Sequence, residues 1–70
     1  MQVFRINAVG KDGRARVLRT AEGATEALAR IRDAFGEYPH AWVTDEQGHD
    51  VRLGDLVRMA EGERKGRDQL

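Results

Sequence analysis

The same succession of patterns occurs twice along this chain of 70 residues: an alternating strand, a turn containing glycine, a second strand and an amphipathic helix. The first copy spans residues 2–35 and the second spans residues 40–61. Alternation with a period of two indicates half-buried strands, and apolar residues spaced by three and four indicate a helix with one buried stripe. The sequence therefore predicts a single α+β domain with elements in the order ββαββα.

The four predicted strands differ in polarity, and this difference suggests their order in the sheet. Residues 2–9 and 40–44 are the most apolar, whereas residues 14–20 carry arginines and residues 49–53 alternate apolar with charged side chains. Charged, irregular strands suit the edges of a sheet, where they discourage pairing with other chains. We therefore expect a four-stranded antiparallel sheet in the order 2-1-3-4, with the long helix on one face and a short C-terminal helix.

The helix boundaries follow from capping signals. Residues 21–35 form the expected long helix, with Thr20 as N-cap and Gly36 as terminator. The short helix is expected over residues 54–61. The charged segment after Gly62 contains one apolar residue, Leu70, and such a segment cannot bury enough apolar surface to fold. The domain is therefore expected to span residues 1–62, followed by a flexible charged tail over residues 63–70.

A chain of this length has room for only a small hydrophobic core. The large apolar side chains are expected to fill it, with alanines between them. They are Phe4, Ile6, Val17, Leu18, Leu28, Ile31, Phe35, Trp42, Val43, Val51, Leu53, Leu56 and Val57. Self-association would bury further apolar surface and compensate for the small core, so a homodimer is one expectation.

The composition argues against several kinds of site. The chain contains no cysteine and no serine, so it lacks a thiolate and the commonest hydroxyl nucleophile. In the predicted second hairpin His40 and His49 are separated by roughly 17 Å, too far to share a metal ion. We expect a non-enzymatic protein without catalytic residues, metal or cofactor.

No segment of the sequence has the run of roughly 18 apolar residues that a membrane helix requires, and the N-terminal residues do not resemble a secretory signal. We therefore expect a cytoplasmic protein that makes no contact with a membrane.

The charges balance, with 12 basic and 12 acidic residues, but they are unevenly distributed. The first hairpin is basic and the second is acidic. One interpretation is that the two hairpins attract each other and neutralise the field locally. The other is that the basic hairpin faces a phosphate backbone or an acidic partner.

Trp42 is the residue most informative about function. Its neighbours Ala41 and Val43 suit the helix-covered face of the sheet, which would turn Trp42 towards the open face. The alternative places Trp42 in the core. An aromatic side chain surrounded by guanidinium groups is typical of a protein-binding hot spot or a base-stacking surface. The expected binding residues are Trp42, Arg5, Arg52, Arg14 and Arg16.

The leading hypothesis is therefore protein–protein interaction or self-association through the open sheet face. The alternative is nucleic-acid binding through the basic first hairpin. Residues 3–35, with the strand Val3–Ile6, the Asp12-Gly13 turn and the basic strand that follows, resemble the N-terminal arm-type DNA-binding domain of tyrosine-recombinase integrases. That resemblance implies DNA contacts from Arg14 and Arg16.

Overall fold

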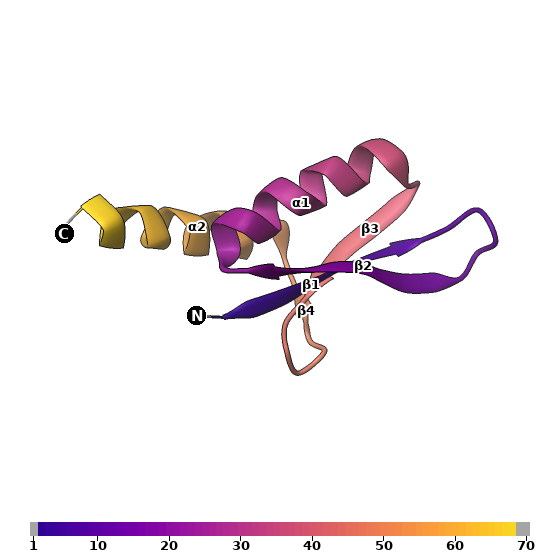
Figure 1. Cartoon of the computed structure of the whole chain (residues 1–70), viewed down its shortest axis with the longest axis horizontal. Helices are drawn as coiled ribbons and strands as arrows, with labels where there is room; N and C mark the ends of the chain where they lie inside the picture. The colour runs from indigo at the N-terminus through magenta and orange to yellow at the C-terminus, as the bar shows by residue number, and fades with distance from the viewer. Residues whose placement is uncertain (1, 69–70) are drawn as a thin grey trace.

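The computed structural model describes residues 2–68, with side chains for residues 2–65, and confirms the ββαββα order. The elements are β1 (Val3–Val9), β2 (Ala15–Glu22), α1 (Ala24–Glu37), β3 (His40–Thr44), β4 (Asp50–Val51) and α2 (Leu53–Asp68). The strands form one antiparallel sheet in the order β2-β1-β3-β4, as the sequence predicted. Helix α1 covers one face of the sheet, and α2 packs against the N-terminal end of α1 (Figure 1).

The register of the sheet decides which side chains face α1. Ile6 lies opposite Val43, and Ala8 lies opposite Ala41. All four are buried, because α1 covers this side of the strands. The buried stripe of α1 that meets them consists of Ala24, Ala27, Ile31 and Ala34.

The expected start of α1 at residue 21, with Thr20 as its cap, is wrong. Strand β2 continues to Glu22, because Ala21 pairs with Phe4 and is buried under the helix layer. Gly23 then takes a φ of 85°, which redirects the chain from strand to helix without a loop. This left-handed conformation favours glycine, because a Cβ atom would be strained there.

The expected end of α1 at Gly36 also differs from the structure. Gly36 lies inside the helix, which ends at Glu37 with Tyr38 in an extended conformation. Tyr38 precedes Pro39, and the proline ring disfavours a helical conformation at the residue before it. Proline, not glycine, therefore sets this boundary.

Helix α2 is longer than the short helix expected over residues 54–61, since it runs from Leu53 to Asp68. The expectation that residues 63–70 form a tail without structure is therefore wrong for residues 63–68, and residues 69–70 lie outside the described residues. The helix continues past Glu61 because its inner side packs on α1 through Ala60 and Glu63.

The core is thinner than expected. Among the residues whose burial the structure describes, twelve apolar residues are buried and seven of them are alanines, and the large side chains that are fully buried are Phe4, Ile6, Ile31 and Leu56. Val17, Phe35 and Leu53 were expected in the core but are about half exposed, at 54%, 49% and 45%. Phe35 follows the buried Ala34 and is therefore rotated off the inner stripe of α1, and Val17 lies on the other face of the sheet.

Candidate functional site: the open face of the sheet

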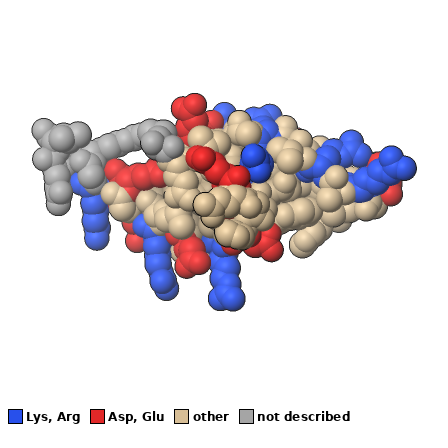
Figure 2. Space-filling model, turned by 90° about the horizontal axis from the view of Figure 1, so that it is seen from below, with Lys and Arg blue, Asp and Glu red and all other residues tan. Residues whose placement is uncertain are grey.

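The side of the sheet opposite α1 is not covered by any other described element, and we call it the open face. It carries Val3, Arg5, Asn7 and Val9 of β1, Ala15, Val17, Thr20 and Glu22 of β2, His40, Trp42 and Thr44 of β3, and Asp50 of β4. Helix α1 lies on the other side, and α2 packs against α1. Figure 2 views the molecule from below, and uncharged surface covers much of the middle of this side, with a few acidic and basic side chains among it.

Trp42 lies on the open face, which decides between the two interpretations of this residue. It pairs with Asn7, while its neighbours Ala41 and Val43 turn towards α1 and are 7% and 2% exposed. The Trp42 side chain is half-buried, and its ring stacks on that of His40 with 5.1 Å between centroids. The indole is thus held against the sheet by its neighbours without being enclosed.

An apolar patch extends from Trp42 across three strands. It consists of Val9, Ala15, Val17 and Trp42, with the His40 ring stacked on Trp42 and with Asn7 between Val17 and Trp42. The sequence interpretation missed Val17 because β2 contains a bulge: Ile6 pairs with Arg19, whereas Asn7 pairs with Val17, so Leu18 is an extra residue. The bulge reverses the alternation along β2, so simple alternation could not have placed Val17 on the open face.

Asn7 and Thr44 form a polar centre next to this patch. The Asn7 amide nitrogen donates to the Thr44 hydroxyl at 3.0 Å, to the Arg5 carbonyl at 3.1 Å and to the Trp42 carbonyl at 3.4 Å. Asn7 and Thr44 are only 8% and 9% exposed although neither of the described helices covers them. These bonds tie β1 to β3 and hold the middle of the open face rigid.

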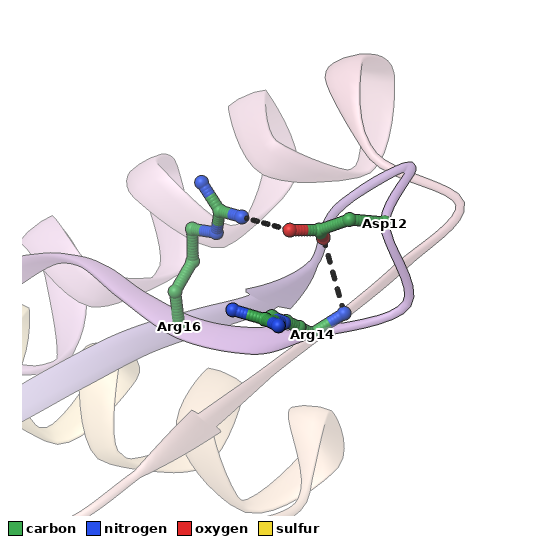
Figure 3. A network of polar contacts seen from close by, with 3 residues as sticks. All are labelled: Asp12, Arg14 and Arg16. Atoms are coloured by element: carbon green, nitrogen blue, oxygen red, sulfur yellow. Dashed lines mark hydrogen bonds and ion pairs between the residues drawn. The ribbon is translucent and has the colours of Figure 1, made fainter.

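The predicted arginines do not surround Trp42. Arg5 shares the open face with Trp42, and Arg52 directly follows β4. Arg16 pairs with Ala8, which places it on the α1 side of the sheet. Its guanidinium contacts Asp12 at 3.0 Å, and the other Asp12 carboxylate oxygen accepts the backbone N–H of Arg14 at 3.1 Å (Figure 3). The structure therefore separates Arg14 and Arg16 from Trp42 and places them at the turn between β1 and β2.

The basic and acidic turns lie at opposite ends of the strands. The β1–β2 turn, which we call the basic tip, comprises residues 10–14 together with Arg16, and Lys and Arg side chains gather there in Figure 2. The β3–β4 turn lies at the other end, where the Val3 N–H donates to Glu46. The two turns themselves do not neutralise each other, because β1 and β3 are antiparallel and their turns point in opposite directions; of the first hairpin, Arg5 lies beside the acidic residues of the second.

We call the end of the open face near the β3–β4 turn the acidic end. Its carboxylates belong to Glu22, Asp45, Glu46 and Asp50, and Arg5 lies beside them, which gives a formal charge of −3. At the basic tip Lys11, Arg14 and Arg16 against Asp12 give +2. The two ends of the open face thus carry opposite charges, and the apolar patch lies between them, closer to the basic tip.

The β3–β4 turn is held by Asp45. Its Oδ1 accepts the N–H groups of His49 and Gln47, each at 2.9 Å. The hydrogen bond from the His49 N–H lowers the pKa of Asp45 below its ordinary value, and the Gln47 N–H and the nearby His49 ring act in the same direction. Asp45 therefore has a structural role in this turn.

Other features of the molecule give no further site on this face. A groove of about 490 Å³ lies on the α1 side of the sheet, between β2 and α1, and contains both acidic and basic side chains. His40 stacks on Trp42 while His49 contacts Asp45, so the two histidines are separate. Within residues 2–68, no cluster of three potential metal ligands is found and no helix has the length and hydropathy to span a bilayer.

Comparisons with protein-family models, curated proteins and solved structures yielded no match to this chain. The resemblance of residues 3–35 to an integrase arm domain therefore remains a prediction.

Proposed function

We propose that this protein is a small non-enzymatic module that binds another protein through the open face of its sheet. The observation that supports this proposal best is the position of the half-buried Trp42 on the same face as Val17, which is 54% exposed and lies across β1 from it, and no other described element covers this face. Contiguous apolar surface on a small domain marks an interaction site, and tryptophan is enriched among residues that dominate binding energy.

The surroundings of the patch fit such an interface. Charged residues lie at both ends of the open face, where they can remain hydrated or meet charges of a partner, and the apolar patch lies between them beside the Asn7–Thr44 pair. The Asn7–Thr44 hydrogen bond satisfies polar groups that a partner would otherwise leave unpaired. An interface of this kind has an apolar centre and a polar rim.

The test compares two substitutions of the same type at different surfaces. Val17→Glu places a charge in the apolar patch, and Phe35→Glu places one on α1, at a residue that is 49% exposed. Sedimentation measures self-association, and capture from an extract of the source cells measures binding to other proteins. We expect Val17→Glu to abolish the association that the wild type shows, and Phe35→Glu to preserve it. Equal behaviour of all three proteins in both measurements would contradict the proposal.

Nucleic-acid binding at the basic tip is a second candidate, favoured by the charge separation along the strands. Asp12 contacts Arg16, and no ion pair of Lys11 or Arg14 is found among the described residues. However, Arg5 and Arg16 lie on opposite faces of the sheet, so the basic residues do not form one surface. Retention on heparin or single-stranded DNA that falls steeply with salt, and is lost in Lys11→Gln/Arg14→Gln, would support this candidate.

We also propose that the protein acts in the cytoplasm. A domain without cysteine needs no oxidising compartment to fold. Imaging of the tagged chain in its own cells tests this placement.

A further inference from the structure

We infer that the partner of the open face is a second copy of this chain, related by a two-fold axis that lays the basic tip of each copy over the acidic end of the other. This inference rests on the proposed function and adds the identity and orientation of the partner. It is supported by the distribution of charge, by the small number of large side chains in the core and by the poor suitability of both sheet edges for pairing with another strand.

The charge distribution selects the orientation. Two open faces can stack about a two-fold axis along the strands, which brings tip over tip, or about an axis across the strands, which brings tip over acidic end. With a charge of +2 at the tip and −3 at the acidic end, the first arrangement is repulsive at both ends and the second attractive at both.

Distance prevents the same neutralisation within one copy. The six steps from Val3 to Val9 span roughly 20 Å at about 3.4 Å per residue, so Glu22, which pairs with Val3, lies about that far along the strands from the turn that follows Val9. The Debye length at physiological ionic strength is about 8 Å, and the two ends of one copy are therefore screened from each other. Stacked sheets are separated by about 10 Å, and long side chains at their rims can meet.

The thin core explains why a second layer would stabilise the molecule. Within the described residues, the large side chains that are fully buried are Phe4, Ile6 and Ile31 of the sheet and α1 and Leu56 of α2, and seven core residues are alanines. Stacking the open faces would create a second apolar layer from Val9, Val17 and Trp42 of both copies. The domain would then have apolar contacts on both faces of its sheet.

The edges of the sheet do not offer an equivalent route to association. Strand β2 carries Arg16 and Arg19 and is bent by the bulge at Leu18, and both features discourage pairing with another strand. The other edge strand, β4, has only two residues. Compared with its edges, the open face of the sheet offers the better surface for the association of two copies.

The expected dimer is weak. The strands have 7, 8, 5 and 2 residues, and at about 3.4 Å per residue and about 4.8 Å between strands they cover roughly 360 Å² in plan on each copy, which is at or below the lower limit of specific interfaces. We expect a dissociation constant on the order of 10–100 μM in low salt. Such a dimer forms at the concentrations accessible to sedimentation and NMR diffusion measurements.

The experiment is sedimentation of the full chain from about 1 μM to about 1 mM, at about 20 mM and about 500 mM salt. We expect a monomer–dimer equilibrium that weakens with salt. Val17→Glu should raise the dissociation constant at least about tenfold, whereas Phe35→Glu should leave it unchanged. Circular dichroism of each variant establishes that the fold is retained.

Charge reversal tests the orientation. Lys11→Glu/Arg14→Glu makes the tip acidic, and Glu22→Lys/Asp50→Lys makes the other end basic. Each double variant alone should dimerise less than the wild type in low salt, because like charges then face each other at both ends. An equimolar mixture of the two should form heterodimers as tight as the wild-type dimer. Unchanged dimerisation of the separate variants would overturn the proposed orientation.

The outcomes separate this inference from the proposed function. A wild type that stays monomeric, yet captures another protein that Val17→Glu does not capture, overturns the dimer and leaves the proposed function standing. Absence of both self-association and capture overturns both. A monomer that binds single-stranded DNA with a steep salt dependence also overturns the dimer and favours the basic tip as a nucleic-acid site.

Discussion

Asn7 lies in an environment that its neighbours in the sequence do not indicate. An asparagine on the polar side of an alternating strand is expected to face solvent. Asn7 is instead 8% exposed, and its side chain donates a hydrogen bond to Thr44, which lies 37 residues away in sequence. The pairing of β1 with β3 brings the two together. Such a contact has no signature in the sequence, because it depends on the register between two strands separated by a helix.

We predict that Asn7→Ala destabilises the domain by about 1–3 kcal/mol, because the Thr44 hydroxyl loses its donor in a buried position. Urea unfolding measures the free energy of unfolding. Thr44→Val should cost a similar amount. The double variant Asn7→Ala/Thr44→Val should lose less than the sum of the two, and strict additivity would show that the two side chains are not coupled.

Asp45 gives the molecule a pH-dependent contribution to stability. Its pKa is lowered in the folded state by hydrogen bonds from the N–H groups of His49 and Gln47. A lowered folded pKa means that the stabilisation is present above the unfolded value of about 3.9 and is lost as the pH falls through the folded value.

We therefore expect the stability of the wild type to fall more steeply than that of Asp45→Asn as the pH decreases from about 5 to about 2. Thermal unfolding at a series of pH values measures this difference. Asp33→Asn, an exposed substitution on α1, provides the control and should keep the wild-type profile. Parallel profiles for wild type and Asp45→Asn would contradict the role of Asp45 in the turn.

Among the elements, α1 depends on α2 for its N-terminal cap. The cap residue Gly23 has no side chain, and the carboxylate of Glu63 in α2 instead accepts the N–H groups of Ala24 and Thr25, the latter at 3.0 Å, and the Thr25 hydroxyl at 2.9 Å. A negative charge at this position also interacts favourably with the helix dipole. The segment expected to be a tail thus supplies a contact that joins the two helices.

We predict that Glu63→Ala lowers the free energy of unfolding by about 0.5–2 kcal/mol, the usual cost of removing an N-terminal cap. Glu63→Gln should cost less, because the amide oxygen still accepts a hydrogen bond. Glu61→Ala changes an exposed glutamate two residues away on the same helix and should have a much smaller effect. Chemical denaturation of the three variants provides the comparison, and equal losses for residues 61 and 63 would rule out the cap.

Substitution by alanine should change the stability of the domain in opposite directions at Gly23, the cap residue of α1, and at Gly36, inside α1. Gly23 has a φ of 85°, and an added Cβ would lie 3.2 Å from the Glu63 carboxylate, so Gly23→Ala should destabilise by about 1–2 kcal/mol. Gly36 lies within the helix with no neighbouring atom in reach, so Gly36→Ala should stabilise by about 0.5–1 kcal/mol. Melting temperatures that shift in the same direction for both would contradict this assignment.

The whole molecule combines a one-sided core with opposite charges at its two ends. A single layer of helix covers the sheet, and the alanines allow α1 to lie close to it, which leaves Trp42 and Val17 on the other side. A domain of about 70 residues built this way has little stability to spare. Any partner that binds the open face of the folded state alone would therefore stabilise the domain by mass action.

For a dimer through the open face, we expect the melting temperature of the wild type to rise by several degrees between about 10 μM and about 1 mM protein. Val17→Glu should melt at the same temperature at all concentrations, and Phe35→Glu should behave like the wild type. Calorimetry over this range provides the measurement. A wild-type melting temperature that does not change with concentration would argue against self-association of the folded state.

Local patterns were sufficient for the type and order of the elements. The alternation of β1 and β3 and the period of α1 are properties of neighbouring residues, and the placement of charged strands at the edges led to the correct strand order. The location of Trp42 on the open face was one of two interpretations that the sequence allowed.

Contacts between distant segments decided the remainder. Register and the bulge at Leu18 put Val17 on the same face as Trp42 and moved Arg16 to the other face, and the antiparallel pairing of β1 with β3 separated the basic and acidic turns. Packing of α2 on α1 extended the second helix to Asp68 and brought Glu63 to the start of the first. A sequence pattern reports the conformation of adjacent residues, whereas these features depend on which segments meet, and only the tertiary structure determines that.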